Sequence, residues 1–405
     1  AALEQGIPVI AVAENVNLMQ NDLRLLPWAT GQLHLVENYW ESAGVMAALK
    51  AVRDVRDQPI TDDKVLAGWN GLMIGGLADT GRVLGKAAYI TAATEAAAAI
   101  HSRMWSSTDG LLRTMRNGEA RIPAFLEDYA LLGDLQTAAL VGCDGAIDWL
   151  SLPRFDSPAC FAALLDDREA GRWQIAPAGG GRATRRGYRG DTLILETEWD
   201  TDEGTVRLID FMPPRGTEPD IVRIVEGVAG RVTMHMDLRL RFDYGHVVPW
   251  VRRHDDDLVA VAGPDSTWLR TEVPLHGEDL ATVSDFDVEA GQRIPFVLAY
   301  AESHHPKPRL VDAEQSLAAT EQFWTSWMAH CDYTGPWEAE VRRSLLLLKA
   351  LTYAPTGGIV AAATTSLPED LGGSRNWDYR YCWLRDATFT LQALLGTGYV
   401  AEARQ

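Results

Sequence analysis

Hydrophobic and polar positions alternate along much of the middle of this chain. Within residues 233–241, Met234, Met236 and Leu238 fall on one face, and polar or charged residues fall on the other. A period of two predicts a β-strand with one buried and one solvated face. Similar runs predict strands at 192–199, 206–211, 221–226, 247–252, 258–262, 267–271 and 293–300. Many short strands separated by turn residues predict a large antiparallel β-sandwich.

Apolar residues recur at helical spacing on both sides of this β-rich region. Before it, the spacing predicts helices over about 69–84 and 87–104, and a further helical run in FLEDYALL at 125–132. After it, helices are predicted over about 311–330, 337–352 and 387–395. The dense leucine run at 345–348 must be buried, since it leaves no solvated face.

Composition and charge exclude several kinds of partner. The 405 residues are 47% hydrophobic and carry a net charge of −19. Nucleic acids and anionic membranes both select a basic surface, so neither is expected as a partner. No apolar run approaches the roughly 20 residues that span a bilayer, and the first residues lack the pattern of a signal peptide. A cytoplasmic location is therefore expected.

The cysteines and histidines form no pattern of metal ligands. There is no CxxC pair among the four cysteines, so reduced thiols are expected. His304 and His305 are adjacent in a loop that is followed by proline, where solvated surface is a better interpretation than a metal site. Neither a metal nor a cofactor is expected.

The stretch Asn376–Leu391, NWDYRYCWLRDATFTL, combines aromatic rings and charges at high density. Its rings and charged groups belong to Trp377, Asp378, Tyr379, Arg380, Tyr381, Trp383, Arg385 and Asp386. Rings can stack on the C–H faces of a sugar while an Arg–Asp pair bonds its hydroxyls. The alternative is the buried start of a helix, with Asp386 near its N-terminus and the rings in the core. Residue types alone leave both interpretations open.

The position of the stretch favours a functional role. A long loop rich in turn residues, about 354–375, leads directly into it. Long structureless loops inside compact domains are usually functional.

From about Glu127 to Gln405 the chain resembles glycoside hydrolase family 15, which includes glucoamylases and bacterial trehalases. The matching wording includes EDYALLGDLQTAALVGCDGAIDWLSLPRFDSPACFAALL at 127–165 and LKALTYAPTGGIVAAATTSLPEDLGGSRNWDYRYCWLRDATFTLQALL at 348–395. The resemblance implies a β supersandwich, a linker helix and an (α/α)6 catalytic barrel, in that order. The predicted strands and helices follow the same order independently.

The resemblance also implies roles for individual residues. It implies a sugar subsite with rings from Tyr379, Tyr381 and Trp383, polar contacts from Arg385 and Asp386, and support from Trp377 and Asp378. The family hydrolyses terminal α-linked glucose with inversion, using an acid and a base well downstream of WLRD. Both are therefore expected beyond Gln405, no catalytic residue is expected within the chain, and the chain alone is expected to be inactive.

Two shorter resemblances precede this region. Residues 61–132 resemble part of the helical toroid of a thioredoxin-domain-containing family, and residues 1–60 resemble the end of an uncharacterised bacterial family. The predicted order is an α/β fragment at 1–60, a helical-toroid fragment at 61–132, the β-sandwich at 133–310, a linker helix at 311–335 and the first hairpin of a truncated barrel at 336–405. Incomplete parts of three proteins predict a fusion or a chimeric splice.

The expected function is that of a glycosidase acting on an α-glucoside or α-glucan. Glucoamylase and trehalase specificity are not distinguished, and the oligomeric state stays open. The alternative is a non-catalytic sandwich that binds carbohydrate or serves as a scaffold. A sugar epimerase based on residues 61–132 is disfavoured, because that segment lacks the paired bases the reaction needs.

Overall fold

The computed structural model describes residues 65–106, 110–116, 119–123, 129–181, 183–309, 311–335, 337–365 and 376–404. It divides into two units, Ala1–Ala124 and Phe125–Gln405. The α/β fragment predicted for residues 1–60 lies outside the described residues.

The first unit contains a helical hairpin and a small sheet. Helices α4 (Ala67–Leu84) and α5 (Ala87–Met104) are joined at Gly85, whose φ of +64° lies in the left-handed region that favours glycine after a helix. Strand β3 is central in an antiparallel sheet formed by β1 (Val65–Leu66), β2 (Trp105–Ser106), β3 (Gly110–Arg116) and β4 (Glu119–Pro123). The two helices predicted in this part of the chain are confirmed.

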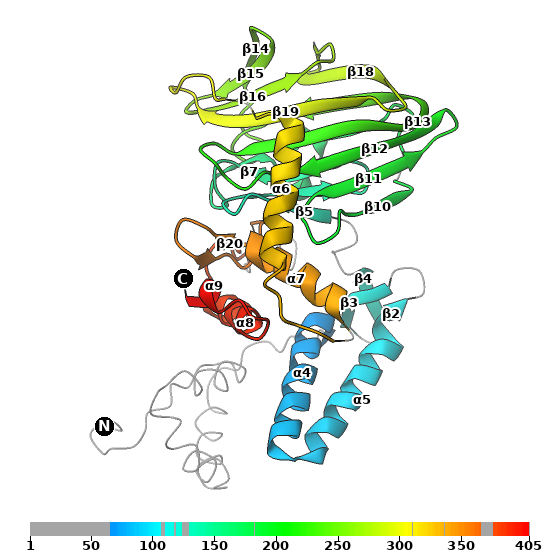
Figure 1. Ribbon diagram of the computed structural model, residues 1–405, viewed down its shortest axis with the longest axis vertical. Helices are drawn as coiled ribbons and strands as arrows, with labels where there is room; N and C mark the ends of the chain where they lie inside the picture. Colours follow the sequence, from blue (N-terminus) through cyan, green and yellow to red (C-terminus); the bar gives the residue numbers. More distant parts are fainter. Residues whose placement is uncertain are drawn as a thin grey trace, which may run out of the picture. The chain divides into compact units, whose positions relative to one another are not determined.

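Most of the second unit is a connected antiparallel system of 15 strands (Figure 1). They are β5 (Tyr129–Gly133), β6 (Ala138–Gly142), β7 (Ala146–Ser151), β8 (Ala159–Phe161), β9 (Arg172–Pro177), β10 (Arg185–Tyr188), β11 (Leu195–Asp200), β12 (Gly204–Phe211), β13 (Asp220–Arg239), β14 (Trp250–His254), β15 (Asp257–Ala262), β16 (Asp265–Thr271), β17 (His276–Glu278), β18 (Ala281–Glu289) and β19 (Arg293–Glu302). The large antiparallel β structure predicted from alternation is confirmed.

Strand β13 is long enough to pair with one set of strands along its first part and with another set along its second part. Its first part pairs with β12 and β19, and its second part pairs with β9 and β18. The strands predicted separately at 221–226 and 233–241 are parts of one continuous strand, which ends at Arg239. Gly227 and Gly230 do not reverse the chain; they allow close approach of neighbouring backbones, since a Cβ on Gly227 would lie 2.1 Å from the carbonyl oxygen of Glu289.

In the second half of β13 only one of the two faces has the environment that the alternation predicts. Met234, Met236 and Leu238 are buried in the main core, as predicted. The opposite face was expected to be solvated, but Arg239 and Arg241 are buried there too. The short 3-10 helices η4 (Ala163–Leu165) and η5 (Arg168–Ala170) belong to the segment that covers it. Arg239 Nη1 donates to Glu169 Oε2 at 3.0 Å, which compensates its burial.

The helical run predicted in FLEDYALL is wrong for its described part. Residues Tyr129–Gly133 form strand β5, which pairs with β6 so that Leu131 lies opposite Leu140. An apolar run this short fits a helix or a strand equally well, and the partner strand decides.

Helices follow the strands and link the sandwich to a second core. They are α6 (Ala313–Met328), α7 (Glu338–Ala350), α8 (Leu384–Leu395) and α9 (Val400–Arg404), with the short strands β20 (Thr352–Tyr353) and β21 (Gly358–Ile359) after α7. Asp312 caps α6 by accepting from the amide of Gln315 at 2.8 Å. Leu317 of α6 packs on the sandwich, whereas Trp324 packs with Leu345 and Leu394 of α7 and α8. Helix α6 thus runs from the sheets to helices α7 and α8 (Figure 1).

These elements confirm the predicted class, a mixed α and β protein with a large antiparallel sheet system and several helices. The complete toroid and barrel remain predictions. No helix in the described ranges is long and apolar enough to cross a membrane.

A fully buried arginine on β13 fastens several strands to one another. Arg223 Nε and Nη2 donate to the two carboxylate oxygens of Asp210 on β12, at 2.8 and 3.1 Å. Its Nη1 donates to the carbonyl of Trp173 on β9 and its Nη2 to that of Gly145, each at 2.7 Å. Neither side chain of the Arg223–Asp210 pair is exposed, so every bond here must be kept for the charges to remain compensated.

Replacing Arg223 with Met is expected to lower the free energy of unfolding of the second unit by about 3–5 kcal/mol, because Asp210 is left charged, buried and unpaired. Urea unfolding followed by tryptophan fluorescence measures this. The control is Arg231→Met, since Arg231 pairs with Asp287 at the surface, where its side chain is 63% exposed. That change should cost less than about 1 kcal/mol; equal losses in both variants would contradict the prediction.

Asp220, at the start of β13, predicts a pH dependence of stability. Burial raises the pKa of its carboxyl; Arg215 opposes this, the nearby Asp134 and Glu218 add to it, and the result is about 7. Between about pH 4 and 7 the folded chain therefore holds a proton that the unfolded chain has lost, so stability falls as pH rises through this window. Asp220→Asn should remove this slope and stabilise the protein above pH 7 by roughly 1–3 kcal/mol, measured as urea midpoints from pH 4 to 8. An unchanged slope would contradict the assignment.

Candidate functional site

Residues 376–383 form an irregular segment with one isolated bridge between Cys382 and Val360, and the chain then enters helix α8. The helix begins at Leu384, with Trp383 as its N-terminal flanking residue, rather than at the predicted residue 387. Asp386 consequently lies in the first turn, where the helix dipole favours a negative charge. The fold therefore fixes Arg385 and Asp386 on a helix end, next to the rings that precede it.

Three of the four rings in the stretch form one cluster. The rings of Tyr379 and Trp383 stack with centroids 5.3 Å apart and planes at 26°. Trp377 meets Trp383 edge-on at 6.3 Å. The indole N–H of Trp383 donates to the carbonyl of Asp378 at 3.1 Å, which fixes the orientation of the ring. Tyr381 does not join the cluster; it lines a pocket nearby.

Arg385 and Asp386 lie beside this cluster and remain accessible. Arg385 Nη2 donates to Asp386 Oδ2 at 3.1 Å, and the two side chains are 47% and 32% exposed. The Arg385 guanidinium lies 5.9 Å from the ring of Trp383. The pair therefore keeps unused donors and acceptors next to an aromatic surface. Because Trp377 and Tyr381 are each about half exposed, the interpretation of the rings as plain core does not hold for them.

Arg380 has the opposite environment, since only 5% of its side chain is exposed. Its Nη2 donates to Asp378 Oδ2 and its Nη1 to the carbonyl of Ser157, each at 2.7 Å. The guanidinium also lies over the ring of Tyr244, 5.6 Å from its centroid. Burial lowers the pKa of Arg380, but Asp378 and Tyr244 outweigh burial and raise it. Arg380 therefore stays charged and anchors the stretch to loops of the sandwich.

The same pairing acts on Asp378. Burial raises the pKa of this carboxyl, but hydrogen bonds from the side chain and backbone of Arg380 prevail and hold the pKa below its usual range. Asp378 is thus a fixed carboxylate at neutral pH. The supporting role predicted for Asp378 stays a prediction, and the anchoring contacts of Arg380 were not predicted.

Backbone hydrogen bonds from the segment 361–362 also hold the stretch. The amides of Ala361 and Ala362 donate to the carbonyls of Tyr381 and Tyr379, at 3.1 and 2.9 Å. The indole N–H of Trp149 on β7 in turn donates to the carbonyl of Ala363 at 2.9 Å. The sandwich therefore positions both the segment 361–363 and the stretch paired with it.

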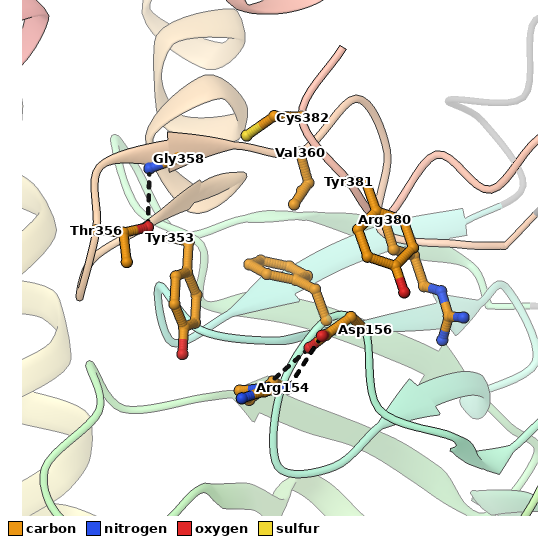
Figure 2. Close-up of a pocket in the computed structure, with 10 residues that line it drawn as sticks. Arg154, Asp156, Tyr353, Thr356, Gly358, Val360, Arg380, Tyr381 and Cys382 are labelled. Carbon is orange, nitrogen blue, oxygen red and sulfur yellow. Dashed lines mark hydrogen bonds and ion pairs between the residues drawn. The ribbon is translucent and has the colours of Figure 1, made fainter.

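A pocket of about 250 Å³ lies where the sandwich meets this stretch (Figure 2). It is lined by Arg154, Phe155, Asp156, Tyr353, Thr356, Gly358, Val360, Arg380, Tyr381 and Cys382. Sequence reasoning did not connect these residues, because about two hundred positions separate the first three from the others. The sequence offered only a weak signal, the turn-rich wording LPRFDSP within the family-like segment.

Within the described ranges, Glu302, His304 and His305 form the single group whose ligand atoms could meet at one metal ion. All three are exposed; Glu302 ends β19, and the two histidines lie on the loop that follows. His304 Nε2 lies 3.4 Å from Glu302 Oε2, a distance that an ordinary surface ion pair explains.

Two family models match the chain. One, described as trehalase-like, N-terminal, matches residues 113–287, and one described as glycosyl hydrolases family 15 matches residues 338–405. A trehalase of Mycolicibacterium smegmatis is 36% identical over 307 residues, which are 69% of this chain and 46% of that protein. Spermatogenesis-associated protein 20 of Homo sapiens is 42% identical over 89 residues, 20% of this chain and 11% of that protein.

Among solved structures, a bacterial glucoamylase complexed with acarbose is similar with a TM-score of 0.50 and 12% sequence identity. The similarity covers 69% of this chain and 48% of that chain, and at this identity it concerns the fold. The chain spans about half the length of the trehalases it matches.

The models that match residues 113–287 and 338–405, together with the trehalases, indicate a class of carbohydrate-active enzymes, the glycoside hydrolases. Within that class the second unit resembles family 15, and the curated relatives it matches over most of its length include trehalases. The resemblance stated from the sequence is confirmed.

Replacing Arg380 with Ala is expected to loosen the stretch. Removing one partner of a buried pair costs roughly 3 kcal/mol, so the amides of Ala361 and Ala362 should exchange with solvent about 100-fold faster. Hydrogen exchange read by mass spectrometry measures this. Arg380→Lys should recover only part of the protection, because lysine lacks the planar fork.

The matched control is Arg385→Ala, which also removes an arginine paired with a nearby aspartate, but one at the surface. Exchange at Ala361 and Ala362 should stay as in the unmodified chain. Equal acceleration in both variants would show that Arg380 has no special anchoring role.

Proposed function

We propose that this chain carries the sugar-binding part of a glycosidase that hydrolyses terminal α-linked glucose with inversion, the substrate being trehalose or an α-glucan. The resemblance to family 15 supports the reaction class. The observation that carries the proposal for the site is the accessible Arg385–Asp386 pair beside the stacked rings of Tyr379 and Trp383. One sugar needs both, a flat apolar surface for its C–H face and paired donors and acceptors for its hydroxyls.

Each residue of the stretch then has a distinct role. Arg385 donates to hydroxyl oxygens of the terminal glucose, and Asp386 accepts from the neighbouring hydroxyl groups. The ring cluster of Trp377, Tyr379 and Trp383 bounds the sugar on one side. Asp378 holds Trp383 through its carbonyl and Arg380 through its carboxylate.

The carboxylates of the stretch suit binding better than proton transfer. A general acid that works near neutral pH needs a raised pKa. Arg380 holds the pKa of Asp378 below its usual range, and Asp386 is already paired with Arg385. We therefore assign neither the catalytic acid nor the base to the stretch, and we propose that the chain binds substrate without hydrolysing it.

Calorimetric titration with trehalose, maltose and a maltooligosaccharide tests the binding role. Arg385→Ala and Asp386→Asn are each expected to weaken the affinity about 10- to 100-fold, because a charged hydrogen bond contributes roughly 1.5–3 kcal/mol. Arg231→Ala, which removes an arginine from an exposed pair on the sandwich, should leave the affinity unchanged.

A parallel assay for released glucose tests the absence of turnover. Hydrolysis that disappears in Arg385→Ala would contradict the purely binding role. Binding that survives both changes would contradict the assignment of the stretch and favour a carbohydrate-binding sandwich.

A further inference from the structure

The pocket between the sandwich and the stretch has three walls from distant parts of the chain. The loop Arg154–Asp156 follows β7, Tyr353 belongs to β20, and Arg380–Cys382 belongs to the stretch. Phe155 is buried at 3% exposure. Figure 2 shows the hydroxyl ends of Tyr353 and Tyr381 directed toward the side where Arg154 and Asp156 lie. Two rings and one ion pair therefore face the same space.

The ion pair in this pocket is planar, doubly bonded and accessible. Arg154 Nε donates to Asp156 Oδ1 at 2.9 Å, and its Nη2 donates to Oδ2 at 3.0 Å. The two side chains are 54% and 35% exposed. Asp156 raises the pKa of Arg154 through these bonds and through its charge, and Tyr353 and Tyr381 raise it slightly further against the effect of burial. Both tyrosines and the ion pair line the same pocket.

We propose that this pocket is a second sugar-binding site, which takes one pyranose ring of an α-glucoside or α-glucan against the rings of Tyr353 and Tyr381 that line it. The Arg154–Asp156 pair bonds adjacent hydroxyls of that ring, with arginine N–H groups donating and carboxylate oxygens accepting. The identity of the sugar rests on the proposed function. The proposal moves Tyr381 from the predicted site at Arg385 and Asp386 to this one.

The charge balance favours a neutral polyol over an anion. Asp156 already neutralises Arg154, so a phosphate or carboxylate in the pocket would meet a carboxylate as well as a guanidinium. A sugar uses both groups, since each of its hydroxyls donates and accepts. The volume of about 250 Å³ lies just below the roughly 300–1,000 Å³ of pockets that hold drug-sized ligands, which suits one ring.

The pocket is separate from the Arg385–Asp386 site but shares the stretch with it. Neither Arg385 nor Asp386 lines the pocket, whereas Arg380, which anchors the stretch, does. A sugar bound here would thus contact the sandwich and the stretch at once.

Cys382 provides a probe inside the pocket, because it lines the wall and is the exposed cysteine of the chain. The full chain is treated with iodoacetamide, and alkylation of each cysteine is followed by peptide mass spectrometry. At trehalose or maltose concentrations about ten times the Kd, alkylation of Cys382 should slow about tenfold. Cys331, which is partly exposed and does not line the pocket, serves as the internal control.

Variants assign the protection to the pocket. Tyr353→Ala and Asp156→Asn should abolish the protection of Cys382, and Tyr353→Phe should retain much of it. Arg231→Ala is the matched control, since it removes an arginine from a surface pair of similar exposure, 63% and 38%, and should leave the protection intact. Asp386→Asn should also leave the protection by single-ring methyl α-glucoside intact.

Three outcomes would overturn the proposal. Sugars that do not slow Cys382 alkylation, or protection by inorganic phosphate instead of sugars, would exclude a sugar site. Protection lost in Asp386→Asn but kept in Tyr353→Ala and Asp156→Asn would place the sugar at Arg385 and Asp386 alone, which contradicts this proposal and supports the proposed function. The proposed function is contradicted separately if the calorimetric affinity for sugars is unchanged in Arg385→Ala and Asp386→Asn.

Discussion

The buried charge of Arg223 is the constraint on which the sandwich depends. Its guanidinium is bonded to Asp210, to the carbonyl of Trp173 and to that of Gly145, which belong to different strands and turns. A buried cation tolerates few alternative arrangements, because any shift that breaks one bond leaves a donor or a carboxylate uncompensated. Polar contacts as well as apolar packing therefore specify the strand register around β13. The loops that connect these strands are held in fixed positions as a result.

Residues of the sandwich and of its loops bond directly to the segments that form the candidate site. Strand β7 carries Trp149, which holds the segment 361–363, and the loop after β7 carries Ser157, which accepts from Arg380. The ring-rich stretch is thus oriented by a domain that contributes no residue to the Arg385–Asp386 pair. Functional groups need rigid support of this kind, because their binding geometry is lost with small displacements. The sandwich and the stretch belong to one compact unit.

Local periodicity predicted most of the fold, and the failures have a common cause. Alternation located β11–β16 and β19, and helical spacing located α4, α5, α6 and α7, whereas β8, β9, β10, β17 and β18 were not predicted. It failed where a partner outside the local run decides the outcome: Tyr129–Gly133 is a strand because β6 pairs with it, and the burial of Arg239 is compensated by Glu169. The Arg385–Asp386 pair was found because its residues are adjacent in sequence. The pocket was missed because Asp156 and Tyr353 meet only in the folded chain.

Burial separates the roles of chemically similar arginine–aspartate pairs in this protein. Arg223 and Asp210 are both fully buried, so all their hydrogen-bonding capacity is used within the fold. Arg380 is buried while Asp378 keeps some exposure, which suits an anchor at the edge of a site. The pairs of Arg385 and Arg154 are about half exposed and retain donors and acceptors for another molecule. Since residue types cannot distinguish these cases, the accessible pairs beside aromatic rings are the ones to which ligand binding is best assigned.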